Sequence, residues 1–76
     1  MKIKEGQLYR HYKNHICKVI GLGRHTETLE ELVFYIQLGD NPEFGENSVW
    51  ARPKKMWFKE VEWNGKKTKR FELIEK

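Results

Sequence analysis

The chain is poor in several features that mark specialised protein classes. Its 76 residues include one cysteine, Cys17, so no internal disulfide can form and cysteine alone cannot hold a zinc ion. No segment approaches the ~18 apolar residues of a membrane-spanning helix. The opening MKIKEGQLYR also lacks the apolar stretch of a signal peptide. We therefore expect a cytoplasmic protein without a membrane partner, because that compartment keeps thiols reduced.

An excess of positive charge is present but small. The net charge is +4, with six Lys/Arg against five Asp/Glu up to residue 40 and nine against six after it. The basic density lies in RPKKMWFK (52–59) and KKTKR (66–70). This excess is compatible with nucleic acid, although it is below that of a dedicated nucleic-acid-binding domain. An ordinary solvated surface explains it more simply.

Aromatic residues, in contrast, are plentiful for one small domain spanning 1–76. A domain of this size buries only about 60 % of its unfolded surface, so large side chains decide its stability. The ten aromatic residues are Tyr9, Tyr12, Phe34, Tyr35, Phe44, Trp50, Trp57, Phe58, Trp63 and Phe71. Most of them must be in the core. We expect Phe34, Phe71 and Trp57 to be buried, and Tyr12, Trp50 and Trp63 to be partly exposed.

Short β-prone segments separated by turn residues predict an all-β chain. The expected strands are residues 7–13, 16–22, 32–38, 49–52 and 68–74. Between them we expect a turn at 26–31, a loop at 39–48 and a helical turn at the start of 54–61. Asn64-Gly65 between β-prone flanks predicts a type I′ hairpin.

Five or six short antiparallel strands with one or two helical turns must hide their edges by closing on themselves. A small SH3-like β-barrel is the most economical arrangement for so short a chain. An OB-type barrel is the second choice, because it usually needs more residues and a true helix.

Five motifs together resemble a family of short bacterial domains of unknown function. They are YRHYK (9–13), RHTET with a later glutamate (24–31), VFY (33–35), W-x-RP (50–53) and MW (56–57). The resemblance extends from about Gly6 to Phe71, and it implies an SH3-like barrel but no activity. Asn14 stands where glycine is common, and the loop 39–48 is longer than usual. Cys17 replaces an aromatic residue, which indicates a packed thiol.

Polar and aromatic residues of these motifs are the candidate ligand-binding residues. They are Tyr9, Arg10, His11, Tyr12, Arg24, His25, Thr26, Glu27, Trp50 and Arg52. An aromatic side chain beside arginine can stack a nucleic-acid base, and an aromatic groove can also hold a peptide. Tyr12, Tyr35, Trp50 and Trp57 are the candidates for such a groove. The structural alternative is that RHTET only builds a polar turn, with its threonines accepting backbone hydrogen bonds.

Metal and catalytic sites are weaker interpretations. His11 and His15 would lie about 13 Å apart along one strand, too far to share an ion unless the turn at Asn14 folds them together. His25 with Glu27 or Cys17 could form a catalytic pair, but no recognisable cofactor loop or oxyanion hole accompanies them. We therefore predict no catalytic residue, no metal ligand and no cofactor.

The resulting prediction is a non-catalytic cytoplasmic binding module. RNA or single-stranded nucleic acid is the favoured partner, and a peptide or protein is the alternative. A small enzyme or metal-dependent domain that uses His11, His25 and Glu27 is less favoured. The oligomeric state is expected to be a monomer or a weak dimer.

Overall fold

The computed structural model describes residues 3–39 and 42–75, which form seven strands and one short 3-10 helix. The strands are β1 (Leu8–His11), β2 (Ile16–Arg24), β3 (Glu31–Gln37), β4 (Ser48–Pro53), β5 (Glu60–Trp63), β6 (Lys66–Lys69) and β7 (Phe71–Glu75). The helix η1 (Lys54–Met56) follows β4 directly. The prediction of an all-β class with short antiparallel strands is confirmed. The strands number seven rather than five or six.

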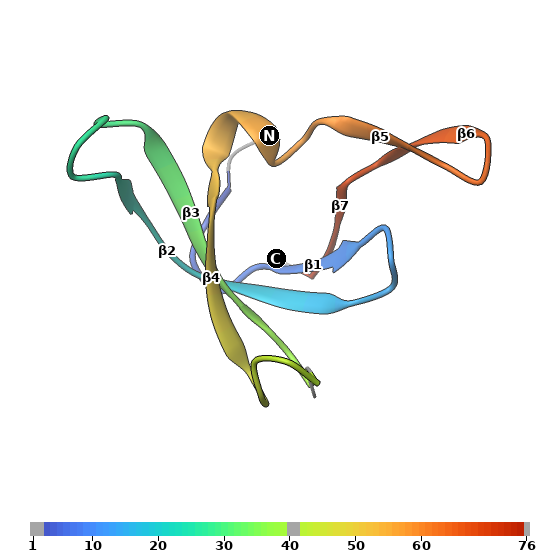
Figure 1. Ribbon diagram of the computed structural model, residues 1–76, viewed down its shortest axis with the longest axis horizontal. Coiled ribbons are helices and arrows are strands. Elements are labelled where there is room, and N and C mark those ends of the chain that lie inside the picture. The colour runs from blue at the N-terminus through green and yellow to red at the C-terminus, as the bar shows by residue number, and fades with distance from the viewer. Residues whose placement is uncertain (1–2, 40–41, 76) are drawn as a thin grey trace.

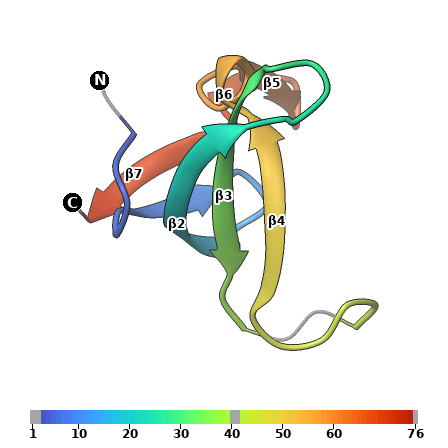
Figure 2. The ribbon, with the colours of Figure 1, turned by 90° about the vertical axis from the view of Figure 1, so that its left-hand side faces the viewer.

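Five strands form one antiparallel sheet in the order β4-β3-β2-β1-β7, and β5 and β6 form a separate hairpin (Figure 1). The sheet is strongly bent, so β1 and β7 cross β3, β4 and the later part of β2 at a large angle (Figure 2). The register of β2 with β3 shifts between Val19 and Gly21. Such a bulge increases local twist and bends the strand, which lets β2 belong to both arms of the sheet.

Turn chemistry accounts for where several strands end. Asn14 has a φ of 72°, and a backbone hydrogen bond from His11 to His15 closes the β1–β2 hairpin. The strand expected at 7–13 is therefore shorter. Asn64 and Gly65 both have positive φ, as the predicted type I′ turn requires. The strand expected at 68–74 is wrong in one respect, because it is interrupted at Arg70 into β6 and β7.

Four aromatic side chains form the centre of the core inside the bent sheet. Trp57, which follows η1, stacks on Phe71 with ring centres 3.9 Å apart, and it meets the edges of Tyr9 and Tyr35 at 5.3 and 5.1 Å. Trp57 thereby packs β3 against β1 and β7. The predicted burial of Trp57 and Phe71 is confirmed. Phe34 is only half-buried, because the period of two turns it away from Val33 and Tyr35.

Gly23 lies against the ring of Phe34 on the outer face of the sheet, and substitution of the glycine tests how tightly the two residues pack. A Cβ at Gly23 would lie 3.0 Å from Phe34 Cε2, whereas a Cβ at Gly21 would meet nothing within 4 Å. Alanine is more favourable than glycine in a strand by about 0.5–1 kcal/mol, but overpacking costs about 1–3 kcal/mol. We expect Gly23→Ala to be less stable than Gly21→Ala by about 1 kcal/mol in urea unfolding. Equal stabilities would contradict this contact.

Candidate functional site

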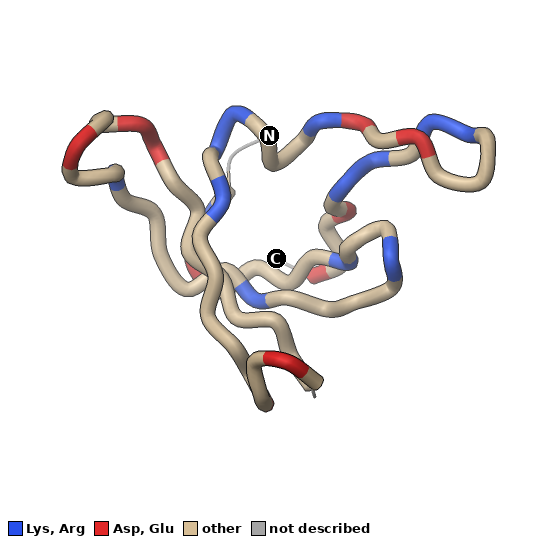
Figure 3. Tube along the Cα trace, in the orientation of Figure 1, with Lys and Arg blue, Asp and Glu red and all other residues tan. Residues whose placement is uncertain are grey.

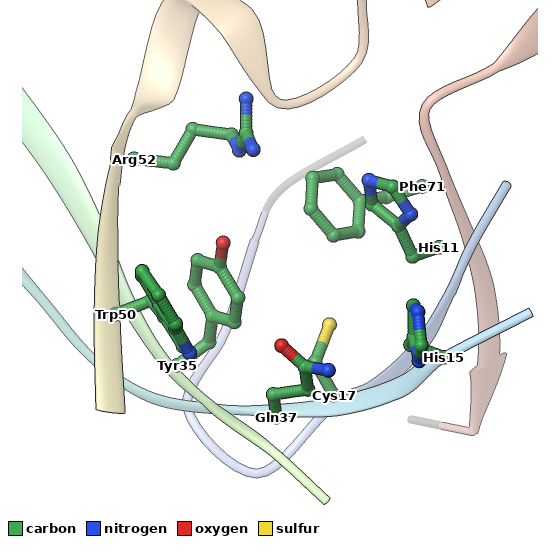
Figure 4. Close-up of a pocket in the computed structure, with 8 residues that line it drawn as sticks. All are labelled: His11, His15, Cys17, Tyr35, Gln37, Trp50, Arg52 and Phe71. Carbon is green, nitrogen blue, oxygen red and sulfur yellow. The ribbon is translucent and has the colours of Figure 1, made fainter. Parts of the chain in front are cut away.

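The inward-facing side chains at one end of the bent sheet surround a hollow of about 290 Å³ (Figure 4). Its walls come from β1, β2, β3, β4 and β7 and from the turn that joins β1 to β2. The lining residues are His11, His15, Cys17, Tyr35, Gln37, Trp50, Arg52 and Phe71. Alternation along each strand explains the set, because Cys17, Tyr35 and Gln37 share the face that carries the core.

Arg52 is the cation of this hollow, and its charge is not neutralised there. Its guanidinium lies 5.5 Å from the centre of the Phe71 ring, and its Nε is buried without a hydrogen-bond partner in the described structure. None of the described residues that line the hollow is acidic. In Figure 4 the hydroxyl of Tyr35 points toward the Arg52 side of the hollow. Arg52 can therefore donate hydrogen bonds to an anionic or other hydrogen-bonding ligand, and few existing contacts need to break for it to do so.

His11 lies between aromatic rings on the opposite wall. Its ring centre is 4.4 Å from that of Tyr12 and 5.1 Å from that of Phe71. Burial lowers the pKa of His11 from 6.5 to about 4, with further lowering by Arg52, His15 and other nearby cations. Its Nδ1 accepts a hydrogen bond from the backbone N–H of Lys13 at 3.2 Å. At neutral pH the imidazole is therefore uncharged, and Nε2 carries its proton.

The thiol of Cys17 also points into the hollow in Figure 4, but it is a packed group. Its residue is 2 % exposed, and burial raises the pKa of Cys17 to about 12. A thiol with so high a pKa carries almost no thiolate at neutral pH, so it is a poor nucleophile. The prediction of a packed rather than reactive cysteine is confirmed.

The RHTET segment forms the turn between β2 and β3 and bonds mainly to itself. His25 Nδ1 accepts hydrogen bonds from the backbone N–H groups of Glu27 and Thr28 at 3.1 and 3.4 Å. Arg24 donates to the carbonyl of Leu29 at 2.8 Å. The residues of this segment are exposed, and Thr26 is among them. These contacts are those of the structural alternative, a polar turn whose side chains hydrogen-bond to its own backbone.

The YRHYK segment divides between core and surface. Tyr9 is 0 % exposed, and its hydroxyl donates to Gln7 Oε1 at 3.0 Å, so its place is the core rather than a binding face. Arg10 is exposed on the opposite face of β1 from His11. Tyr12 is half-buried and meets the edge of Trp63 at 5.3 Å. Of the ten candidates, His11, Trp50 and Arg52 line the hollow. Arg10 and Tyr12 lie with His11 in a separate recess.

The proposed convergence of His11, His25 and Glu27 is wrong. His11 is beside the start of β2, while His25 and Glu27 follow its end, and Figure 1 shows the two turns at opposite sides of the molecule. Within residues 3–39 and 42–75, no three His, Cys, Asp or Glu side chains group closely enough to hold a metal ion. His11 and His15 do approach across their turn, with ring centres 6.2 Å apart.

Four residues that line the hollow were not predicted to be ligand-binding residues. Phe71 was assigned to the core and Cys17 to a packed thiol. His15 was considered only as a metal ligand, and Gln37 was given no role. Gln37 continues the inward alternation of Val33 and Tyr35, so extending the period of two to the end of β3 would have identified it. His15 carries no such signal, because it lies in the turn before β2.

Charged residues are distributed unevenly along the chain (Figure 3). The β2–β3 turn is acidic, and its Glu31 and Glu30 pair with Lys54 and Lys55 at 3.3 and 2.9 Å. The segment from residue 59 to residue 70, which holds the β5–β6 hairpin, has five Lys/Arg against two Glu. The side of His11 is therefore the more basic one, whereas lysines balance the glutamates on the side of His25.

Comparisons with known proteins place these features in a family. In the described part of the chain, no helix is both long enough and apolar enough to cross a membrane. No curated protein matches the sequence. A crystal structure of a DUF1653 protein from Bordetella bronchiseptica is similar, with 28 % sequence identity and a TM-score of 0.81 over 97 % of this chain and 90 % of that one. The model of the protein family of unknown function DUF1653 matches residues 7–73. The chain therefore belongs to the DUF1653 family.

Proposed function

We propose that this domain is a cytoplasmic SH3-like binding module that holds one unit of a single-stranded nucleic acid in the hollow. The observation that carries the proposal is Arg52, an unneutralised cation set among the rings of Tyr35, Trp50 and Phe71. Such a combination suits a ligand that is both aromatic and anionic. Stacking of a base on an aromatic side chain contributes about 1–3 kcal/mol, and arginine adds a cation–π contribution.

The size of the hollow limits what it can hold. Drug-sized ligands occupy pockets of roughly 300–1,000 Å³, and this hollow of about 290 Å³ lies at the lower limit. It suits a single base or nucleotide rather than several. Further affinity for a strand must therefore come from outside the hollow.

The charge distribution supplies that outer contact. The basic β5–β6 hairpin lies on the same side of the molecule as the β1–β2 turn (Figure 1), and Lys13 in that turn follows His11 by two residues. Contact between Tyr12 and Trp63 connects the hairpin to the β1–β2 turn. A strand with one base in the hollow would have its neighbouring phosphates near these lysines, and away from the acidic β2–β3 turn.

Titration of the protein with short single strands of RNA and DNA, followed by tryptophan fluorescence, tests this function. With about three phosphates contacted, affinity should fall on the order of 20-fold for a fourfold rise in salt. Duplex DNA of the same length is the control, and it should bind less tightly because its bases are paired and stacked inside the helix. Absence of binding to every strand at low salt would contradict the proposal. Salt-insensitive binding of an apolar peptide would instead favour a peptide-binding module.

A further inference from the structure

We propose that the mouth of the hollow contains a phosphate-binding site in which Arg52 and His11 are the two donors. This inference rests on the proposed function in one respect, because the phosphate would be that of the bound strand. It adds a definite ligand chemistry and a definite pair of residues. The same chemistry can come from free phosphate, and the experiment below separates the two sources.

The first argument is the hydrogen-bonding capacity that the fold leaves unused. The Nε atoms of Arg52 and Arg70 are both buried and both lack a hydrogen-bond partner in the described structure. A buried donor without an acceptor costs free energy, because its lost hydration is not replaced by a hydrogen bond. None of the ion pairs within the described residues involves Arg52, since they join Arg24, Lys54 and Lys55 to glutamates. An anion on Arg52 would supply the missing acceptor, and a guanidinium can bind phosphate with two parallel hydrogen bonds.

The second argument is the electrostatic environment of His11. The groups that lower its pKa by their charge are Arg52 on β4, Arg70 before β7, and Lys13 and His15 in the β1–β2 turn. On its other side, His11 adjoins a recess that also contains Arg10, Lys69 and the one carboxylate of that recess among the described residues, Glu72. Cationic groups therefore dominate the surroundings of His11.

A bound anion would reverse this balance. The neutral His11 already has its proton on Nε2, because Nδ1 accepts the Lys13 hydrogen bond. An anion held by Arg52 would favour a second proton on the imidazole, which must go to Nδ1 and replace the Lys13 hydrogen bond there. The negative charge of the anion would thereby raise the pKa of His11 from its free value of about 4. By linkage, the anion must then bind more tightly as the pH falls from neutrality toward that free value.

NMR of the intact protein, labelled with ¹⁵N, tests the site with anions alone. Inorganic phosphate is added at constant ionic strength, and the Arg52 Nε–H and the His11 ring signals are followed. We expect saturable shifts at both residues. Sulfate, whose charge does not change over the range, is used for a pH series, in which the His11 midpoint should rise by at least one unit. Saturable binding should tighten as the pH falls through the raised midpoint toward the free value, and the total gain should approach at least tenfold.

Variants of Arg52 and Arg24 show which arginine is responsible for the shift of the His11 signals. Arg52→Met should abolish the saturable shift of His11, whereas Arg24→Met, which removes an exposed arginine at the other end of β2, should leave it unchanged. Arg52→Lys keeps the charge but loses the planar donor pair, and it should weaken binding severalfold. If Arg52→Met does not fold, the Arg52→Lys variant and the wild-type titration decide whether Arg52 binds the anion. No saturable shift in the wild type, or an undiminished one in a folded Arg52→Met, would overturn the site.

Two further ligands separate the phosphate site from the proposed function. One is uridine 5′-monophosphate, and the other is a single strand without terminal phosphates. If strands bind but neither inorganic phosphate nor the monophosphate shifts Arg52 and His11, the phosphate site is wrong and the proposed function stands. If the free anions bind through Arg52 but no strand does, the phosphate site stands and the nucleic-acid function is wrong. In that case the ligand is a free phosphate compound.

Discussion

Trp57→Ala is expected to lower the free energy of unfolding by about 3–5 kcal/mol, the range for removing a buried aromatic side chain. A chain of 76 residues has roughly 4–11 kcal/mol in total by the usual per-residue range. The expected loss equals the whole stability at the low end of that range and is close to half of it at the high end. No other substitution considered in this protein should have so large an effect on stability.

The effect is large because Trp57 joins elements that do not pair with one another. Within the described structure, β4 and β7 are the two edges of the five-stranded sheet. Trp57 leaves η1 directly after β4 and stacks on Phe71, the first residue of β7. It also contacts Tyr9 and Tyr35 on β1 and β3. Its removal leaves a cavity that the bent sheet can close only by losing its curvature.

Urea unfolding followed by far-ultraviolet circular dichroism measures this effect. The matched control is Trp63→Ala on the β5–β6 hairpin, where the tryptophan is 44 % exposed and contacts mainly Tyr12. We expect that variant to lose about 1 kcal/mol, as for a surface aromatic pair. Similar losses for the two tryptophans would show that Trp57 does not hold the sheet together.

Local chemistry made much of the fold predictable. Asn64-Gly65 specifies its hairpin through two positive φ values, and the β-prone runs around Val19 and Val33 form the two longest strands. The break at Arg70 was not predictable in this way. TKRFELI (68–74) reads as one continuous strand, and the interruption arises from tertiary hydrogen bonds, in which the backbone of Arg70 donates to Lys59 and accepts from Tyr12.

The candidate site was predictable only in part, for a geometric reason. His11, Trp50 and Arg52 come together because their strands bring inward-facing positions to one end of the sheet. Arg24 and His25 have the same residue chemistry, but the nine residues of β2 separate them from that end. Motif composition cannot show at which end of a strand a residue lies relative to another motif. Strand order and register decide it.

Trp50→Leu is expected to weaken binding of single-stranded nucleic acid by roughly 5- to 150-fold, which corresponds to the loss of about 1–3 kcal/mol of base stacking. Trp50 lies at the side of the hollow in Figure 4, and its Nε1 donates to Ser48 Oγ at 2.8 Å. That hydrogen bond fixes the indole, so the ring is already oriented before a base arrives. Leucine keeps an apolar side chain there but removes the flat surface.

Fluorescence anisotropy of a labelled strand measures this effect, because it does not depend on tryptophan emission. Phe58→Leu is the matched control, since Phe58 is an aromatic residue of 40 % exposure that does not line the hollow. That variant should bind like the wild type. The salt dependence of Trp50→Leu should also equal that of the wild type, because stacking releases no counterions from phosphates. A changed salt dependence with unchanged affinity at low salt would mean that bases do not stack on Trp50, and the strand would then contact the domain only through its phosphates.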